Sequence, residues 1–182
     1  MRLKRNSIKA LSLIALIWIS FGCSKLDRLT QFYLDYDETI VIPAVLGLNL
    51  PFNILTPNIK TNTEEILEIN DTRKNLIEEV RLEELSLNII DPADSDFSFL
   101  KSIEIYIESE NAEELMIAWK YEIDNSIGSS LVLEVSDKDL TQYIIEDEFS
   151  LKITSVTDEI PLTDHEIEIQ SQFFVNASIL GI

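Results

Sequence analysis

Two residues in this sequence could serve as a catalytic base or a soft metal ligand, and each type occurs once. His165 follows Asp164 near the C-terminus, and Cys23 follows an apolar run near the N-terminus. A catalytic triad needs a histidine beside a nucleophile, and no G-x-S-x-G motif is present. A zinc site needs three or four converging ligands. The sequence therefore predicts no enzyme, and it assigns no catalytic residue, metal site or cofactor.

The 33 acidic residues offer a second kind of chemistry. The segment Asp91–Asp96 holds three carboxylates, a spacing that could wrap a calcium ion. It lacks the glycine and the bidentate glutamate of a helix–loop–helix calcium site, so a solvated turn is favoured. Paired carboxylates could also hydrolyse glycosides, but such pairs are defined by their separation in space. A carboxylate-based hydrolase therefore stays open as an alternative.

Aromatic side chains on a strand could bind sugars, because the apolar face of a ring can stack on a sugar ring. Trp119 and Tyr121 lie in a stretch where apolar and polar residues alternate. They share the parity of Leu115 and Ile117, which favours burial of both. Tyr106 lies on the polar parity of the preceding predicted strand, and it is the candidate ligand platform.

Period-two alternation of apolar and polar residues predicts the strands that position these side chains. A short helix is predicted at Asp137–Ile145, after Ser136 as its N-cap, and a further helical turn or two after Asn70. About nine or ten short strands with one short helix, and no βαβ alternation, predict an all-β antiparallel β-sandwich. The predicted strands are 31–36, 39–46, 51–56, 61–69, 82–90, 103–108, 115–123, 131–135, 149–156 and 166–177.

A long uncharged stretch runs between Glu38 and Lys60. Its prolines prevent a continuous helix, so it does not span a membrane. Two interpretations stay open: a pair of buried strands, or an apolar loop around Val45–Phe52 that docks on a lipid surface or a partner. Leu48, in the predicted turn, is the candidate docking residue, whereas Val45 and Phe52 are assigned to the core.

The N-terminal segment has the order of a secretory signal, with basic residues, then an apolar run at 10–21, then Gly22 and Cys23. The residues Ser20-Phe21-Gly22-Cys23 resemble the lipobox of bacterial lipoproteins. The resemblance implies that 1–22 is a signal peptide and that Cys23 carries lipid at the new N-terminus. About a dozen apolar residues fall short of the roughly 20 of a spanning helix, so an uncleaved anchor is not expected.

The rest of the chain divides into a short lipidated tether, 23–28, and one β-sandwich domain, 29–182. In its lipobox and strand pattern the chain is similar to small uncharacterised β-sandwich lipoproteins of Gram-negative bacteria of the Bacteroidota type. The resemblance transfers no functional residues. It implies a lipid-anchored place in the cell envelope. By the same resemblance, Ser24 in place of an aspartate implies the outer membrane, at its periplasmic face or at the cell surface.

The charge of the chain limits its partners. The formal net charge is −19 at pH 7, and four of the 14 basic residues precede Cys23. Such a chain repels nucleic acid and does not adsorb to anionic lipid by charge, so the membrane is reached through the lipid on Cys23. We expect a non-enzymatic binding or scaffolding role with an envelope protein or glycan as partner. The alternative is a glycan- or calcium-binding accessory lipoprotein.

Overall fold

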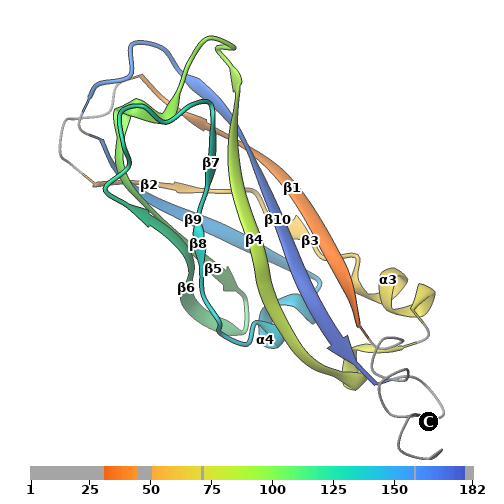
Figure 1. Cartoon of the computed structure of the whole chain (residues 1–182). Helices are drawn as coiled ribbons and strands as arrows, with labels where there is room; N and C mark the ends of the chain where they lie inside the picture. Colours follow the sequence, from red (N-terminus) through yellow and green to blue (C-terminus); the bar gives the residue numbers. More distant parts are fainter. Residues whose placement is uncertain (1–30, 45–50, 71, 158, 179–182) are drawn as a thin grey trace, which may run out of the picture.

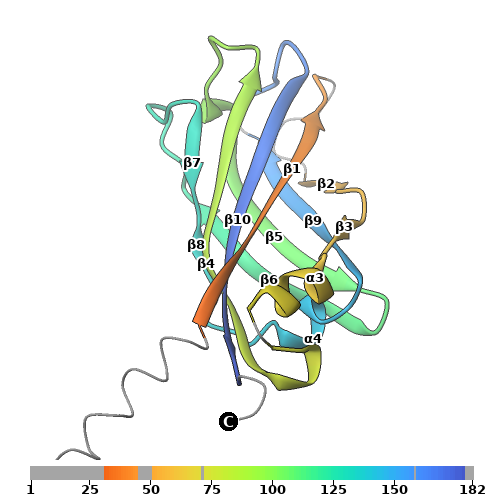
Figure 2. The same ribbon diagram turned by 90° about the vertical axis from the view of Figure 1, so that its right-hand side faces the viewer.

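The computed structural model describes residues 31–44, 51–70, 72–157 and 159–178. These residues form ten strands in two antiparallel sheets, which Figures 1 and 2 show as two packed layers. The predicted all-β antiparallel sandwich is therefore confirmed. The predicted signal peptide, the tether with Cys23, and Leu48 lie outside the described residues.

Four strands form one sheet and six form the other. The four-stranded sheet has the order β1 (Gln31–Ile42), β10 (His165–Ala177), β4 (Ile77–Asp91) and β7 (Ser130–Val132). The six-stranded sheet has the order β2 (Pro51–Leu55), β9 (Glu148–Thr157), β5 (Leu100–Ser109), β6 (Ala112–Tyr121) and β8 (Glu134–Val135), and β3 (Ile59–Lys60) also pairs with β9.

The chain moves regularly between the two layers. Each strand of the four-stranded sheet is followed by two strands of the six-stranded sheet, until β10 returns to lie between β1 and β4. The first and last described strands pair over their whole shared length, from Gln31 opposite Asn176 to Ile42 opposite His165. This alternation is the double-sheet arrangement of a jelly roll.

Alternate side chains of both sheets form the core. Three aromatic rings from three strands meet there: the ring of Tyr36 lies 5.3 Å from that of Phe149 and 5.7 Å from that of Phe173, in edge-to-face geometry. Burial raises the pKa of the Tyr36 phenol to about 12. That phenol donates a hydrogen bond to the carbonyl oxygen of Thr61, 2.9 Å away. The core is therefore tied to the segment that follows β3.

The described residues form two short α-helices, whereas the sequence predicted one. The prediction of a strand over 61–69 was wrong, because α3 (Thr63–Ile69) forms there with two acidic residues in its first turn, where the helix dipole favours them. Leu67 is buried and Ile69 is 75% exposed, so these two residues do not share a face as strand parity requires. The helix predicted at Asp137–Ile145 is confined to α4 (Thr141–Ile144). After Asn70 a 3-10 turn (Lys74–Leu76) leads directly into β4.

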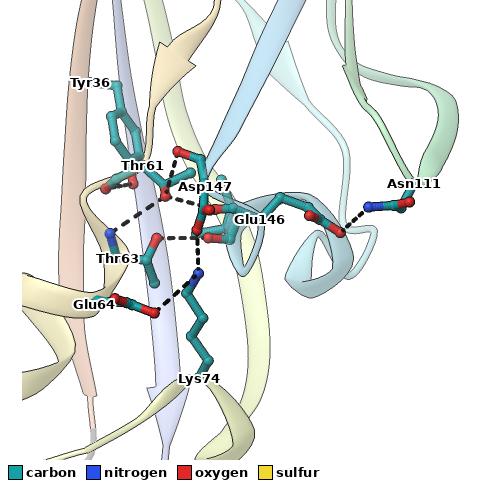
Figure 3. A network of polar contacts seen from close by, with 9 residues as sticks. Tyr36, Thr61, Thr63, Glu64, Lys74, Asn111, Glu146 and Asp147 are labelled. Atoms are coloured by element: carbon teal, nitrogen blue, oxygen red, sulfur yellow. Dashed lines mark hydrogen bonds and ion pairs between the residues drawn. The ribbon is translucent and has the colours of Figure 1, made fainter.

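A network of polar contacts joins α3 to the segment between α4 and β9 (Figure 3). The hydroxyl of Thr61 donates to the carbonyl oxygen of Glu146 at 2.7 Å, and the hydroxyl of Thr63 donates to that of Ile144 at 2.8 Å. Lys74 Nζ lies 2.8 Å from a carboxylate oxygen of Asp147. Both threonines are buried, and the bond from Thr63 satisfies the carbonyl of the buried residue Ile144.

We predict that Thr63→Val lowers the free energy of unfolding by about 1–3 kcal/mol, because it leaves the buried carbonyl of Ile144 without its donor. Thr39→Val is the matched control, since Thr39 is exposed on β1 and its change should stay within about 0.5 kcal/mol. Urea unfolding of both variants measures the difference. Equal stability of the two variants would show that the network does not hold α3 in place.

Candidate functional site

A β-bulge in β6 determines what the outer face of the six-stranded sheet presents. Ile105 of β5 pairs with Ala118, but the next residue, Tyr106, pairs with Met116, so Ile117 is an extra residue in β6. Ile117 and its neighbour Ala118 are both fully buried. A bulge of this kind places two successive residues of one strand opposite one of the partner. The parity of β6 therefore reverses after Ile117.

The reversal turns two aromatic side chains outward. Trp119 lies opposite Glu104, and Tyr121 lies opposite Ser102, on the face away from the buried pair Ile105 and Ala118. Tyr121 is 48% exposed and Trp119 is half-buried. The prediction that both are buried was wrong, because it assumed one unbroken parity through β6. Trp119 and Tyr121 thus join the candidate Tyr106, which lies half-buried on the same outer face of the sheet.

We call this surface the aromatic face and define it by Tyr106, Trp119 and Tyr121 with the carboxylates of Glu104 and Glu134. Its residues form cross-strand rows, since directly paired residues point to the same side. One row runs from Thr154 on β9 through Glu104 and Trp119 to Glu134 on β8. The rows on either side hold Tyr106 and Tyr121. The three rings therefore lie on two adjacent strands in three successive rows.

The polar tip of each ring is fixed by a carboxylate. The phenol groups of Tyr106 and Tyr121 donate to the two oxygens of Glu104, each at 2.7 Å. The indole N–H of Trp119 donates to Glu134 at 3.1 Å. Hydrogen bonds to an ionised acceptor are short and strong, so Glu104 holds one ring from each strand. The rings are positioned before any ligand arrives.

The same contacts shift the ionisation of the phenols. The hydrogen bond to Glu104 is the main cause that raises the pKa of Tyr106 to about 12, with desolvation and the negative charges of nearby carboxylates adding to it. The pKa of Tyr121 is also raised, chiefly by its bond to Glu104. Both phenols therefore stay protonated and keep donating at neutral pH.

Lysines and a hollow border the aromatic face. Lys152 Nζ lies 5.4 Å from the centre of the Tyr106 ring and 2.6 Å from Glu114, and Lys120 lies 3.9 Å from Glu134. Glu108 of β5 and Ser150 of β9 are the next residues on the outer face beyond Tyr106 and Lys152. They line a hollow of about 500 Å³. That hollow is lined by Asn58, Glu108, Ser109, Glu110, Ala112, Glu114, Glu148, Phe149 and Ser150.

The other chemically capable residues do not converge. His165 is only 6% exposed, its ring centre lies 4.7 Å from that of Phe99, and its Nδ1 has no hydrogen-bond partner within the described segments. No aspartate or glutamate in the described part of the chain is buried. Among the same residues there is no group of three or more His, Cys, Asp or Glu that could hold a metal ion.

The predicted acidic turn has a local structural role. Asp91 and Asp94 are exposed, and a carboxylate oxygen of Asp96 accepts a hydrogen bond from the backbone N–H of Ser98 at 3.0 Å. That bond caps the 3-10 turn Phe97–Phe99, and the side chain of Ser98 together with its backbone N–H lowers the pKa of Asp96. In addition, none of the helices described here is both long and apolar enough to cross a membrane.

Sequence reasoning found Tyr106 but missed Glu104, Glu134 and the two β6 rings as parts of one surface. The alternation of Ile103, Ile105 and Ile107 with polar residues already placed Glu104 beside Tyr106 on the outer parity of β5. Nothing in the run of apolar residues through β6 marks Ile117 as the extra residue.

We predict that Glu104→Gln lowers the pKa of both Tyr106 and Tyr121 toward the ordinary value of about 10, because it removes the charge that disfavours each phenolate. A raised tyrosine pKa stabilises the fold below pH about 10, and that contribution is lost as the pH rises toward about 12. NMR titration with ring-labelled tyrosine separates these two signals from the remaining tyrosines. Unchanged titration in the variant would contradict the bridging role of Glu104.

Comparison with known proteins gives no family. No family model matches the sequence, and no curated protein matches it. Among solved structures, the decameric BFDV capsid protein matches with a TM-score of 0.39 at 8% identity, over 81% of this chain and 98% of that one. N-glycanase F (PNGase F) matches with a TM-score of 0.39 at 11% identity, over 82% of this chain and 43% of that one. The C-terminal domain of a chitobiase from Bacteroides fragilis matches with a TM-score of 0.32 at 11% identity, over 72% and 66%. Likenesses this distant say nothing of what the present chain binds.

Proposed function

We propose that this chain is a lipid-anchored, non-enzymatic binding module of the cell envelope, and that the aromatic face binds a glycan. The observation that carries the proposal is the grouping of three aromatic rings on one accessible sheet face, with their polar tips fixed by Glu104 and Glu134. Ring faces offer apolar contact to sugar C–H groups, and carboxylates accept hydrogen bonds from sugar hydroxyls.

The rigidity of this surface supports a binding role. Trp119 and Tyr121 lie on β6, which pairs with β5 on one side and β8 on the other, and Tyr106 lies on β5 between β6 and β9. Ligand binding therefore orders few side chains, and the entropy cost of association is reduced. Ligand binding by rings that are already positioned on paired strands needs no catalytic group.

The position of the anchor fits this proposal. The lipidated cysteine would precede Gln31, and β1 begins at the end of the sandwich where α3, α4 and the end of β10 also lie (Figures 1 and 2). The aromatic face lies on the outer side of the six-stranded sheet, whereas β1 belongs to the four-stranded sheet. A module tethered there would keep this face open to a ligand beside it.

We predict that Trp119→Ala and Tyr121→Ala each weaken glycan binding roughly tenfold, since an aromatic contact contributes about 0.5–1.5 kcal/mol beyond its buried area. Tyr33→Ala is the matched control, because Tyr33 is 55% exposed on β1 of the other sheet. A glycan array followed by isothermal titration measures the affinities, and melting temperatures confirm that each variant is folded. Equal binding by the wild type and both β6 variants would refute the assignment of this face.

We also predict that Cys23→Ser leaves the protein unprocessed or releases it from the membrane, because each buried CH₂ of an acyl chain contributes about 0.8 kcal/mol to membrane binding. Mass spectrometry of the mature N-terminus and membrane fractionation test this prediction, and Ser24→Ala serves as the control that keeps the cysteine. An unmodified N-terminal peptide that begins at another residue would end the lipoprotein interpretation.

A further inference from the structure

The shape of the aromatic face limits the length and direction of its ligand. Its rings occupy three successive rows along β5 and β6, from the row of Tyr106 to that of Tyr121. With a rise of about 3.4 Å per residue these rows span about 14 Å along the strands, whereas adjacent strands are only about 4.8 Å apart. The surface is therefore a narrow band, longer than one sugar ring, that follows the strand direction.

The charges around the band limit the ligand further. Glu104 and Glu134 lie within it, and Glu114 lies at its border beside Lys152. The two ammonium groups at its border are already engaged, Lys152 with Glu114 at 2.6 Å and Lys120 with Glu134 at 3.9 Å. An anionic ligand would thus meet carboxylates and paired lysines on a chain whose formal net charge is −19.

We infer that the aromatic face takes an uncharged glycan chain of several sugar units, laid along β5 and β6, and that it rejects the same chain when that chain carries carboxylates. The inference rests on the proposed glycan-binding function and adds the class of ligand. The rings stack on successive sugars, and Glu104 and Glu134 accept hydrogen bonds from sugar hydroxyls that are donors and carry no charge.

The test uses pairs of polysaccharides that share a backbone and differ in charge: hydroxyethyl and carboxymethyl derivatives of cellulose, dextran and mannan. The whole mature protein is assayed in neutral detergent by affinity electrophoresis. At about 0.01 M salt, where the Debye length is about 30 Å, we expect the carboxymethyl form to bind at least tenfold more weakly than its neutral partner. At about 1 M salt, where that length is about 3 Å, the difference should shrink to less than threefold.

A variant pair tests the role of the local charges. Glu114→Gln frees the ammonium of Lys152, so it should raise affinity for the carboxymethyl chain severalfold and leave affinity for the neutral chain unchanged. Glu84→Gln removes one negative charge from the exposed side of β4 in the other sheet. It should change neither the affinity for the carboxymethyl chain nor that for the neutral chain. An equal rise in affinity for the carboxymethyl chain in both variants would show that only the total charge matters. It would refute the role assigned to Glu114 and Lys152.

A length series completes the test. For the backbone that binds, affinity should rise from the monosaccharide to the trisaccharide by at least tenfold and then level off. Equal binding of the monosaccharide, or equal or tighter binding of the carboxymethyl chain, would overturn this inference while the proposed function stands. Failure of every neutral and charged chain to bind would instead overturn the proposed function, and the inference with it.

Discussion

The pairing of β10 with both β1 and β4 is the contact on which the rest of the fold depends. β10 lies between these strands along its whole length, and its inward residues Ile167, Ile169, Phe173 and Val175 are almost completely buried. Ser171 on β10 donates a hydrogen bond to the carbonyl of Tyr36 on β1, 135 residues away in sequence. Contacts of such separation form only after a large loop-closure cost, so the sandwich cannot be completed until the last strand is in place.

The strands β5 and β10 were the part that the sequence predicted best, whereas the two strands predicted at 31–36 and 39–46 are the single strand β1. Where one face of a strand is buried and the other is exposed to solvent, the alternation of apolar and polar residues follows directly from packing, as in β5 and β10. The helix α3 was missed because Leu67 and Ile69 match strand spacing, and only the tertiary structure shows that Ile69 is left outside. The bulge at Ile117 was missed because a run of apolar residues hides a change of parity, and the identity of the outer face depends on that change.

The outer faces of the two sheets show why one of them is the better ligand surface. On the four-stranded sheet, one row holds Asp35, Gln172 and Glu84, and the amide of Gln172 donates to Asp35 at 2.9 Å. The polar groups of this row bond to one another and offer no apolar area, and the rings on this face, Tyr33 and Phe174, form a separate edge-to-face pair with centres 5.8 Å apart. On the six-stranded sheet the carboxylates are bonded to ring tips, so apolar ring faces and hydrogen-bond acceptors lie side by side. A ligand with C–H faces and hydroxyl groups needs both.

The bulge also has an evolutionary consequence. If β6 kept Ile117 but paired it regularly with Ile105, every later residue of the strand would move to the opposite face of the sheet. Trp119 and Tyr121 would then be directed inward together, and the neighbouring polar residue Lys120 would be directed outward. Loss of the codon for Ile117 would instead leave Ala118 opposite Ile105 and Trp119 opposite Glu104, so the pairing would become regular and both rings would stay on the outer face. Related genes could therefore present the same two rings either with a bulge in this strand or with one residue fewer.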